Sequence, residues 1–237
     1  MKVKNFILCL IIGLGLVGSA WADTLDFGMV APTSGTVSYA GGSAALIGSG
    51  IQVDNVVLLS NSSTLYLSGG LLDFNTGSGS YTGSGTSWAW TGSGTGNSIT
   101  LTGSAYTACT TFVGTTCTVF GGSLIASGTL LSGSFGTASI TNVSSTFKIA
   151  ASGFSDVKNT DLASYFGLPG GSTLYIGNFN LSFNTAATSC CGAFTSSGLL
   201  SGDLTNVPTP EPAAIVFLGT SLLCAGGLLR RRFRGKA

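Results

Sequence analysis

Apolar and polar residues alternate with a period of two along much of the region 23–206. The alternation is clearest at Leu65–Leu67, Ile99–Leu101, Phe147–Ile149 and Phe179–Phe183. A period of two places successive side chains on opposite faces of a β-strand, so that one face is apolar and the other polar. Clusters of Gly, Ser and Asn separate these runs, as turns do. The pattern therefore predicts a domain of many short β-strands.

Helical spacing is almost absent from the same region. The best candidate is Asn159–Phe166, with Asn159 or Thr160 as the N-cap and Pro169 after its end. The low-complexity stretch 77–96 repeats Gly-Ser-Gly and could form a loop or a Gly-rich hairpin. In a hairpin, Trp88 and Trp90 would lie on one face of a short strand.

These patterns predict an all-β fold, an antiparallel β-sandwich or jelly-roll-like body, because the strand lengths are uneven. A β-solenoid is the alternative, although no repeat of fixed length is sustained across the region.

The most unusual feature of the composition is its low content of charged residues. Charged residues make up 7% of the chain, against about 25% in typical globular proteins. Residues 23–206 contain two lysines, Lys148 and Lys158, and seven aspartates, which gives a net charge of −5. A basic surface for nucleic acid is therefore excluded for this region.

Residues for the common catalytic and metal sites are missing. The chain has no histidine, which excludes Ser-His-Asp and Cys-His systems and most catalytic zinc sites. Since Glu211 is the only glutamate, a glycosidase would need two aspartates in the domain. Asp156 and Asp161 are the nearest pair, but loop solvation or helix capping explains them better. We therefore expect no enzyme, cofactor or metal site.

Aromatic residues offer one candidate for ligand contact. Tyr81, Trp88 and Trp90 could stack on sugar rings, although packing in the core is the favoured interpretation. Thr86, Thr91 and Thr95 are too unevenly spaced for a flat ice-binding array.

The N-terminal segment has the pattern of a secretory signal peptide. Lys2 and Lys4 precede the apolar run Phe6–Val17, and Ala20-Trp21-Ala22 fits the small-x-small cleavage rule. We expect residues 1–22 to be removed after export.

The C-terminal segment has three parts. A Pro-rich stretch, 207–212, precedes the uncharged apolar stretch 213–229, and 230–237 is basic. Basic residues beside a span stay in the cytoplasm, which predicts a single-pass helix with the β domain outside. The cytoplasmic stop-transfer residues would be Arg230, Arg231, Arg232 and Arg234.

This order of Pro210-Glu211-Pro212, apolar span and arginine cluster resembles the PEP-CTERM sorting signal, which is also labelled an ice-binding protein C-terminal domain. The resemblance covers about the last 30 residues. It implies an exosortase-type processing enzyme as partner, transient retention in the inner membrane and cleavage near the motif. Delivery to the cell envelope or the extracellular exopolysaccharide matrix would follow.

Four cysteines lie in the domain, and export makes disulfides plausible. Cys109 and Cys117 are eight residues apart around Gly114, which favours a bridge across a hairpin. Cys190 and Cys191 are adjacent and could pair with each other or elsewhere, so three pairings remain open.

Together these features favour a structural or interaction protein of the cell surface or matrix. A polysaccharide- or ice-binding module on the cell surface is the alternative.

Overall fold

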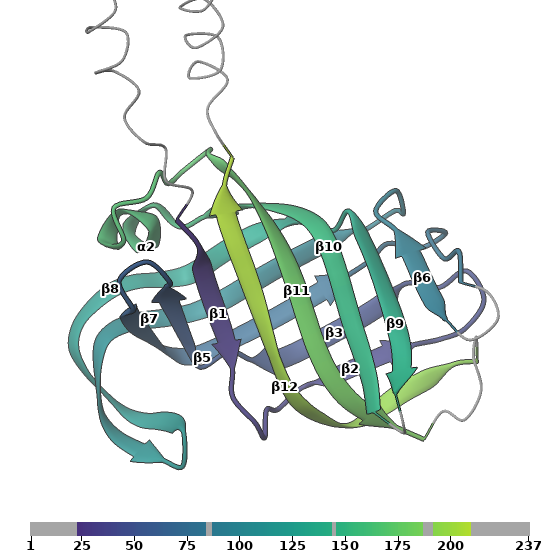
Figure 1. Cartoon of the computed structure of the whole chain (residues 1–237), viewed down its shortest axis with the longest axis horizontal. Coiled ribbons are helices and arrows are strands. Elements are labelled where there is room, and N and C mark those ends of the chain that lie inside the picture. Colours follow the sequence, from purple (N-terminus) through teal and green to yellow (C-terminus); the bar gives the residue numbers. More distant parts are fainter. Residues whose placement is uncertain (1–22, 84–86, 144–145, 187–191, 210–237) are drawn as a thin grey trace, which may run out of the picture. The chain divides into compact units, whose positions relative to one another are not determined.

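Twelve β-strands and one short helix make up the part of the chain that the computed structural model describes, residues 23–83, 87–143, 146–186 and 192–209 (Figure 1). The strands are β1 (Leu25–Met29), β2 (Thr36–Tyr39), β3 (Leu46–Gln52), β4 (Asn55–Leu58), β5 (Ser63–Asn75), β6 (Trp88–Thr91), β7 (Ser98–Val113), β8 (Thr116–Ser134), β9 (Thr137–Val143), β10 (Thr146–Lys158), β11 (Leu174–Thr185) and β12 (Phe194–Pro208). The helix is α2 (Thr160–Tyr165).

The sheet closes on itself as a barrel of eight antiparallel strands. Its pairings run from β5 through β7, β8, β10, β11, β12, β1 and β4 back to β5. The all-β prediction is confirmed. The predicted sandwich or jelly-roll arrangement is not confirmed, because a single sheet forms the whole wall. Sandwiches and barrels share the same alternation along each strand, and here the pairing of β1 with β12 closes the ring.

Two positions in the barrel wall are each filled by a pair of short strands. β1 and β2 both pair with β12, while β3 and β4 both pair with β5. Asp54, between β3 and β4, accepts hydrogen bonds from the Val30 backbone N–H at 2.9 Å and from Gln52 Nε2 at 2.7 Å. The Asp54 carboxylate thus links the β3–β4 connection to the β1–β2 connection, which begins at Val30.

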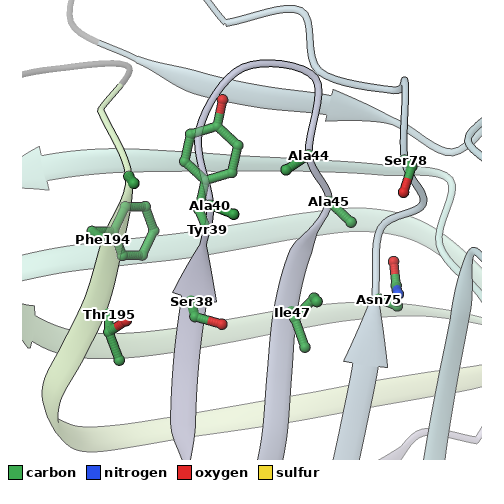
Figure 2. A pocket seen from close by; sticks show the side chains of 11 residues that line it. Ser38, Tyr39, Ala40, Ala44, Ala45, Ile47, Asn75, Ser78, Phe194 and Thr195 are labelled. Atoms are coloured by element: carbon green, nitrogen blue, oxygen red, sulfur yellow. The ribbon is translucent and has the colours of Figure 1, made fainter.

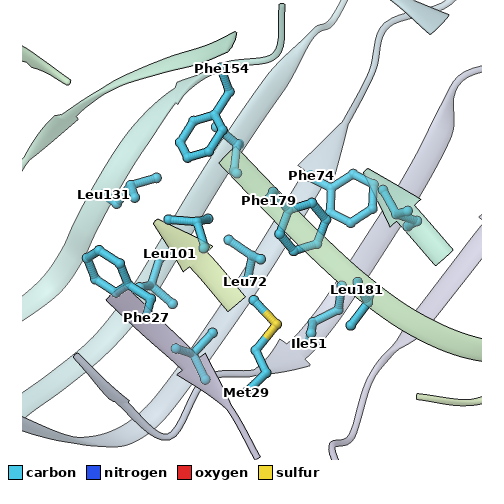
Figure 3. Close-up of a cluster of buried hydrophobic side chains, with 14 of the residues drawn as sticks. Phe27, Met29, Ile51, Leu72, Phe74, Leu101, Leu131, Phe154, Phe179 and Leu181 are labelled. Atoms are coloured by element: carbon cyan, nitrogen blue, oxygen red, sulfur yellow. The ribbon is translucent and has the colours of Figure 1, made fainter. Parts of the chain in front are cut away.

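The predicted alternation separates the inside of the barrel from the outside. Apolar side chains fill the interior (Figure 3). The residues named in all four alternating runs are buried, at 4% exposure or less: Leu65, Leu67, Ile99, Leu101, Phe147, Ile149, Phe179, Leu181 and Phe183. An eight-stranded barrel has an interior that is just wide enough for side chains to fill. The interior is therefore a hydrophobic core.

Gly133 of β8 lies opposite Asp156 of β10 and allows these two neighbouring strands to approach closely. A Cβ at this position would lie 2.0 Å from the Ser155 carbonyl oxygen and 2.6 Å from the Asp156 Cα. The obstacle is backbone, so any side chain would push the strands apart. Glycine at this position thus has a direct packing role in the wall.

The predicted helix is confirmed, with Asn159 as its N-cap. The Asn159 side-chain oxygen accepts hydrogen bonds from the backbone N–H groups of Asp161 and Leu162, as N-cap residues do. β12 ends at Pro208, so the first two residues of the predicted Pro-rich segment belong to a strand. Within the described ranges, no helix is long and apolar enough to cross a membrane.

Candidate functional site

A polar cluster lies inside the barrel, at the end of β10 that leads into α2 (Figure 1). Asp156 and Lys158 form an ion pair whose side chains are both 0% exposed. Asn206 of β12 donates a hydrogen bond to Asp156 Oδ1 at 2.6 Å. The Lys158 ammonium lies 4.7 Å from the ring centre of Tyr175 and 5.5 Å from that of Phe27. Aromatic faces attract such a cation, so the charge is compensated on several sides.

Burial shifts the pKa values of this cluster. It lowers the pKa of Lys158 from 10.5 to about 8, against the opposing effect of the Asp156 carboxylate. It also raises the pKa of Asp156, while Lys158 and Asn206 act in the opposite direction. Burial, followed by the charge of Asp156, raises the pKa of Tyr175 to about 12. The Asp156 carboxylate and the Lys158 ammonium thus form an ion pair within an apolar core.

The prediction that Asp156 is a solvated or helix-capping residue is wrong, since only 1% of it is exposed. Phe154, Asp156 and Lys158 alternate along one strand and all three are buried. The period-two pattern that was used for the apolar runs would have placed all three side chains inward. Asp161 does lie in the first turn of α2, as predicted for a capping position.

A pocket of about 540 Å³ opens on the surface beside β2 and β3. Figure 2 shows lining residues on neighbouring segments, with Thr195 beside Ser38, then Ile47, then Asn75. The complete lining is Ser38, Tyr39, Ala40, Ala44, Ala45, Ile47, Asn75, Ser78, Ala193, Phe194 and Thr195. Hydroxyl and amide groups therefore stand beside apolar surface, with no ionised side chain in the lining.

The aromatic residues singled out in the sequence belong to the core behind this pocket. Trp88 and Trp90 are each 1% exposed. Trp90 Nε1 donates to the Ala44 carbonyl oxygen at 3.1 Å, and Tyr81 stacks on Tyr39 with ring centres 5.3 Å apart. Packing, the favoured interpretation, is confirmed for the two tryptophans, which are not available for sugar stacking. Both tryptophans lie on the buried face of β6, and Tyr81 forms an isolated antiparallel bridge with Trp90.

The hairpin of β7 and β8 extends beyond the barrel wall, at the lower left of Figure 1. We call residues 107–128 the arm. A disulfide joins Cys109 to Cys117 across it, which confirms the favoured pairing. Large apolar side chains remain exposed on the arm: Phe112 at 47%, Val113 at 69%, Val119 at 49% and Leu124 at 53%. The sequence indicated the bridge, but not that the strands around it leave the barrel.

One carboxylate is affected by the charge of another on the neighbouring strand. The pKa of Asp26, on β1, is raised by burial and then by the charge of Asp203, on β12. Neither residue lines the pocket described above. Within the described ranges, no group of three or more His, Cys, Asp or Glu residues could hold a metal ion.

Comparison with family models, with curated proteins and with solved structures finds no match for this chain.

The predicted residues of the two chain ends lie outside the described residues. This applies to the signal peptide 1–22, to Pro210, Glu211 and Pro212, to the apolar segment 213–229, and to Arg230, Arg231, Arg232 and Arg234. Cys190 and Cys191 are also outside them. The candidate interaction surfaces in the described part of the chain are therefore the pocket and the arm.

Proposed function

We propose that the chain is exported and sorted to the cell surface or the exopolysaccharide matrix, where its β domain is a structural or interaction protein. The observation that carries the proposal is the ordered tail: Pro210-Glu211-Pro212, the apolar segment 213–229, then the arginine cluster. An exosortase-type enzyme would cleave this tail after transient anchoring in the inner membrane.

Features of the domain support this assignment. The Cys109–Cys117 disulfide suits an oxidising compartment outside the cytoplasm. The barrel interior is filled by side chains, which leaves the outer surface for interactions. That surface is poor in charge, because only nine charged residues occur in the domain. A domain of this kind suits contact with neutral, hydroxyl-rich material better than contact with nucleic acid.

Replacing Pro210, Glu211 and Pro212 by alanine should abolish removal of the tail in the native host. The processing enzyme would no longer find its motif, so the chain should stay in the inner membrane with residues 213–237 attached. Intact mass spectrometry of the membrane and extracellular fractions measures this directly. Thr209→Ala, adjacent to the motif, is the control and should be processed like the wild type. Normal processing of the triple variant would show that another feature is recognised.

A polysaccharide- or ice-binding module is the second candidate, and the surface pocket favours the polysaccharide. The exposed Ile47 beside Ser38, Asn75 and Thr195 combines apolar and hydrogen-bonding groups, as small-ligand sites do. If the pocket binds glycan, Ala40→Trp should fill it and weaken binding of the host exopolysaccharide about tenfold or more. Isothermal titration measures this, with Leu59→Trp as control, because Leu59 is 52% exposed and does not line the pocket. Equal binding by both variants would exclude the pocket, and a thermal-hysteresis assay tests ice binding.

A further inference from the structure

The arm leaves one long strand edge open. On the side away from β7, β8 pairs with β10 only from Leu131 to Ser134. Just before that, Asn159 bonds to the Thr129 and Leu130 carbonyl oxygens. Between Thr116 and Gly128, this side of β8 has no strand partner among the residues that the structure describes. A free edge carries a row of backbone N–H and C=O groups that can pair with another strand.

The sequence of the arm lacks the usual protection of such an edge. Natural edges are blocked by charged side chains, especially lysine, or by proline. Here the whole stretch from Phe74 to Phe147 contains neither a charged residue nor a proline. β-Bulges are the one device present. The register of β7 against β8 shifts beside Gly122, between Gly121 and Leu124, and again between Cys117 and Val119. These irregularities bend β8, but they add no charge or proline, and Thr116–Phe120 consists of residues that favour β-strands.

The arm is also held in shape before any partner arrives. The disulfide ties Cys109 to Cys117 near its tip. The ring centre of Tyr66, on β5, lies 5.7 Å from that of Phe112. The ring centres of Tyr106 and Phe120 are 5.5 Å apart. A preorganised strand loses less conformational entropy on binding than a flexible one. This exposed hairpin is therefore suited to association.

We propose that the open β8 edge of the arm is a strand-pairing site for a second copy of this chain. Two such edges can pair antiparallel about a two-fold axis, and each then satisfies the other's backbone groups. Because the segment is uncharged, no like charges meet. The exposed Val119 and Leu124 would gain cross-strand neighbours in the same step, which cover part of their apolar surface.

Other occupants fit this edge less well. A polyanion would find no basic residue on the arm, and a glycan does not present amide groups at the spacing of a strand. The inference goes beyond the proposed sorting function and concerns the domain alone, so it stands whether or not the tail is processed.

The test measures the oligomeric state of the full-length chain in detergent by analytical ultracentrifugation. The wild type should form dimers whose fraction rises with concentration. Val119→Lys and Leu124→Lys each place a charge on the arm and should raise the dissociation constant about tenfold or more. Ile176→Lys is the matched control, because Ile176 is also a strand residue and is 54% exposed. It should associate like the wild type.

Hydrogen exchange locates the contact independently. Amides between Thr116 and Phe120 should exchange more slowly in the dimer than in the monomer. Circular dichroism and the intact mass of the disulfide-bonded form check that each variant is folded. A wild type that is monomeric at all concentrations would overturn the proposal. So would association that is unchanged in both arm variants, because the contact would then lie elsewhere.

Discussion

Replacing Asp156 by alanine should lower the free energy of unfolding of the barrel by about 3–5 kcal/mol. The change leaves the Lys158 ammonium, which is fully buried, without its carboxylate. It also removes the acceptor of the Asn206 side-chain N–H. Equilibrium urea unfolding, followed by the fluorescence of the buried Trp88 and Trp90, measures the loss. A change below about 1 kcal/mol would show that water or another group reaches the lysine.

The double variant Asp156→Leu, Lys158→Met distinguishes the contribution of the ion pair from the cost of leaving the lysine charge unpaired. Because the attraction within a buried ion pair barely repays its desolvation, an apolar pair of similar volume is often as stable. The double variant should therefore recover most of the loss. A deficit of about 1 kcal/mol should remain, since the amide of Asn206 keeps no partner. A double variant as unstable as Asp156→Ala would mean that the ion pair itself stabilises the barrel.

The strands were predictable from sequence because their signal is local. Phe179–Phe183 and Phe147–Ile149 alternate, and in the structure these strands pair, with Phe147 opposite Phe183. Closure of the barrel has no such signal. It depends on β1 meeting β12, with Leu25 opposite Asn206. Nothing in either strand alone distinguishes this pairing from that of a sandwich.

For the candidate sites, too, local features could be predicted and contacts between distant strands could not. The spacing of Cys109 and Cys117 is a local property, and the bridge could be predicted from it. The environment of Asp156 could not, because Tyr175 and Asn206 reach it from two other strands. The open edge of the arm was equally hidden, since β10 pairs only with the last four residues of β8. Such features depend on which strands become neighbours, which alternation does not determine.

Replacing Phe179 by alanine should lower the free energy of unfolding by about 3–5 kcal/mol, the usual cost of removing a buried aromatic ring. Phe179 is 0% exposed, and its ring centre lies 5.4 Å from that of Phe74 and 6.3 Å from that of Phe135. Ile176→Ala is the control on the same strand. Because Ile176 is 54% exposed, its loss should stay below about 1 kcal/mol. Urea unfolding of both variants gives the comparison.

The stability losses of Phe179→Ala and Ile176→Ala together test whether the barrel interior is a packed core or a ligand chamber. If its interior were a chamber for a ligand, Phe179 would border open space, and its removal would enlarge that space at little cost in stability. A cost near that of a close-packed core, in which the ring loses many contacts at once, means that the interior is committed to holding the fold. Recognition then falls to the outside of the barrel, where the pocket beside Tyr39 and the open edge of the arm lie.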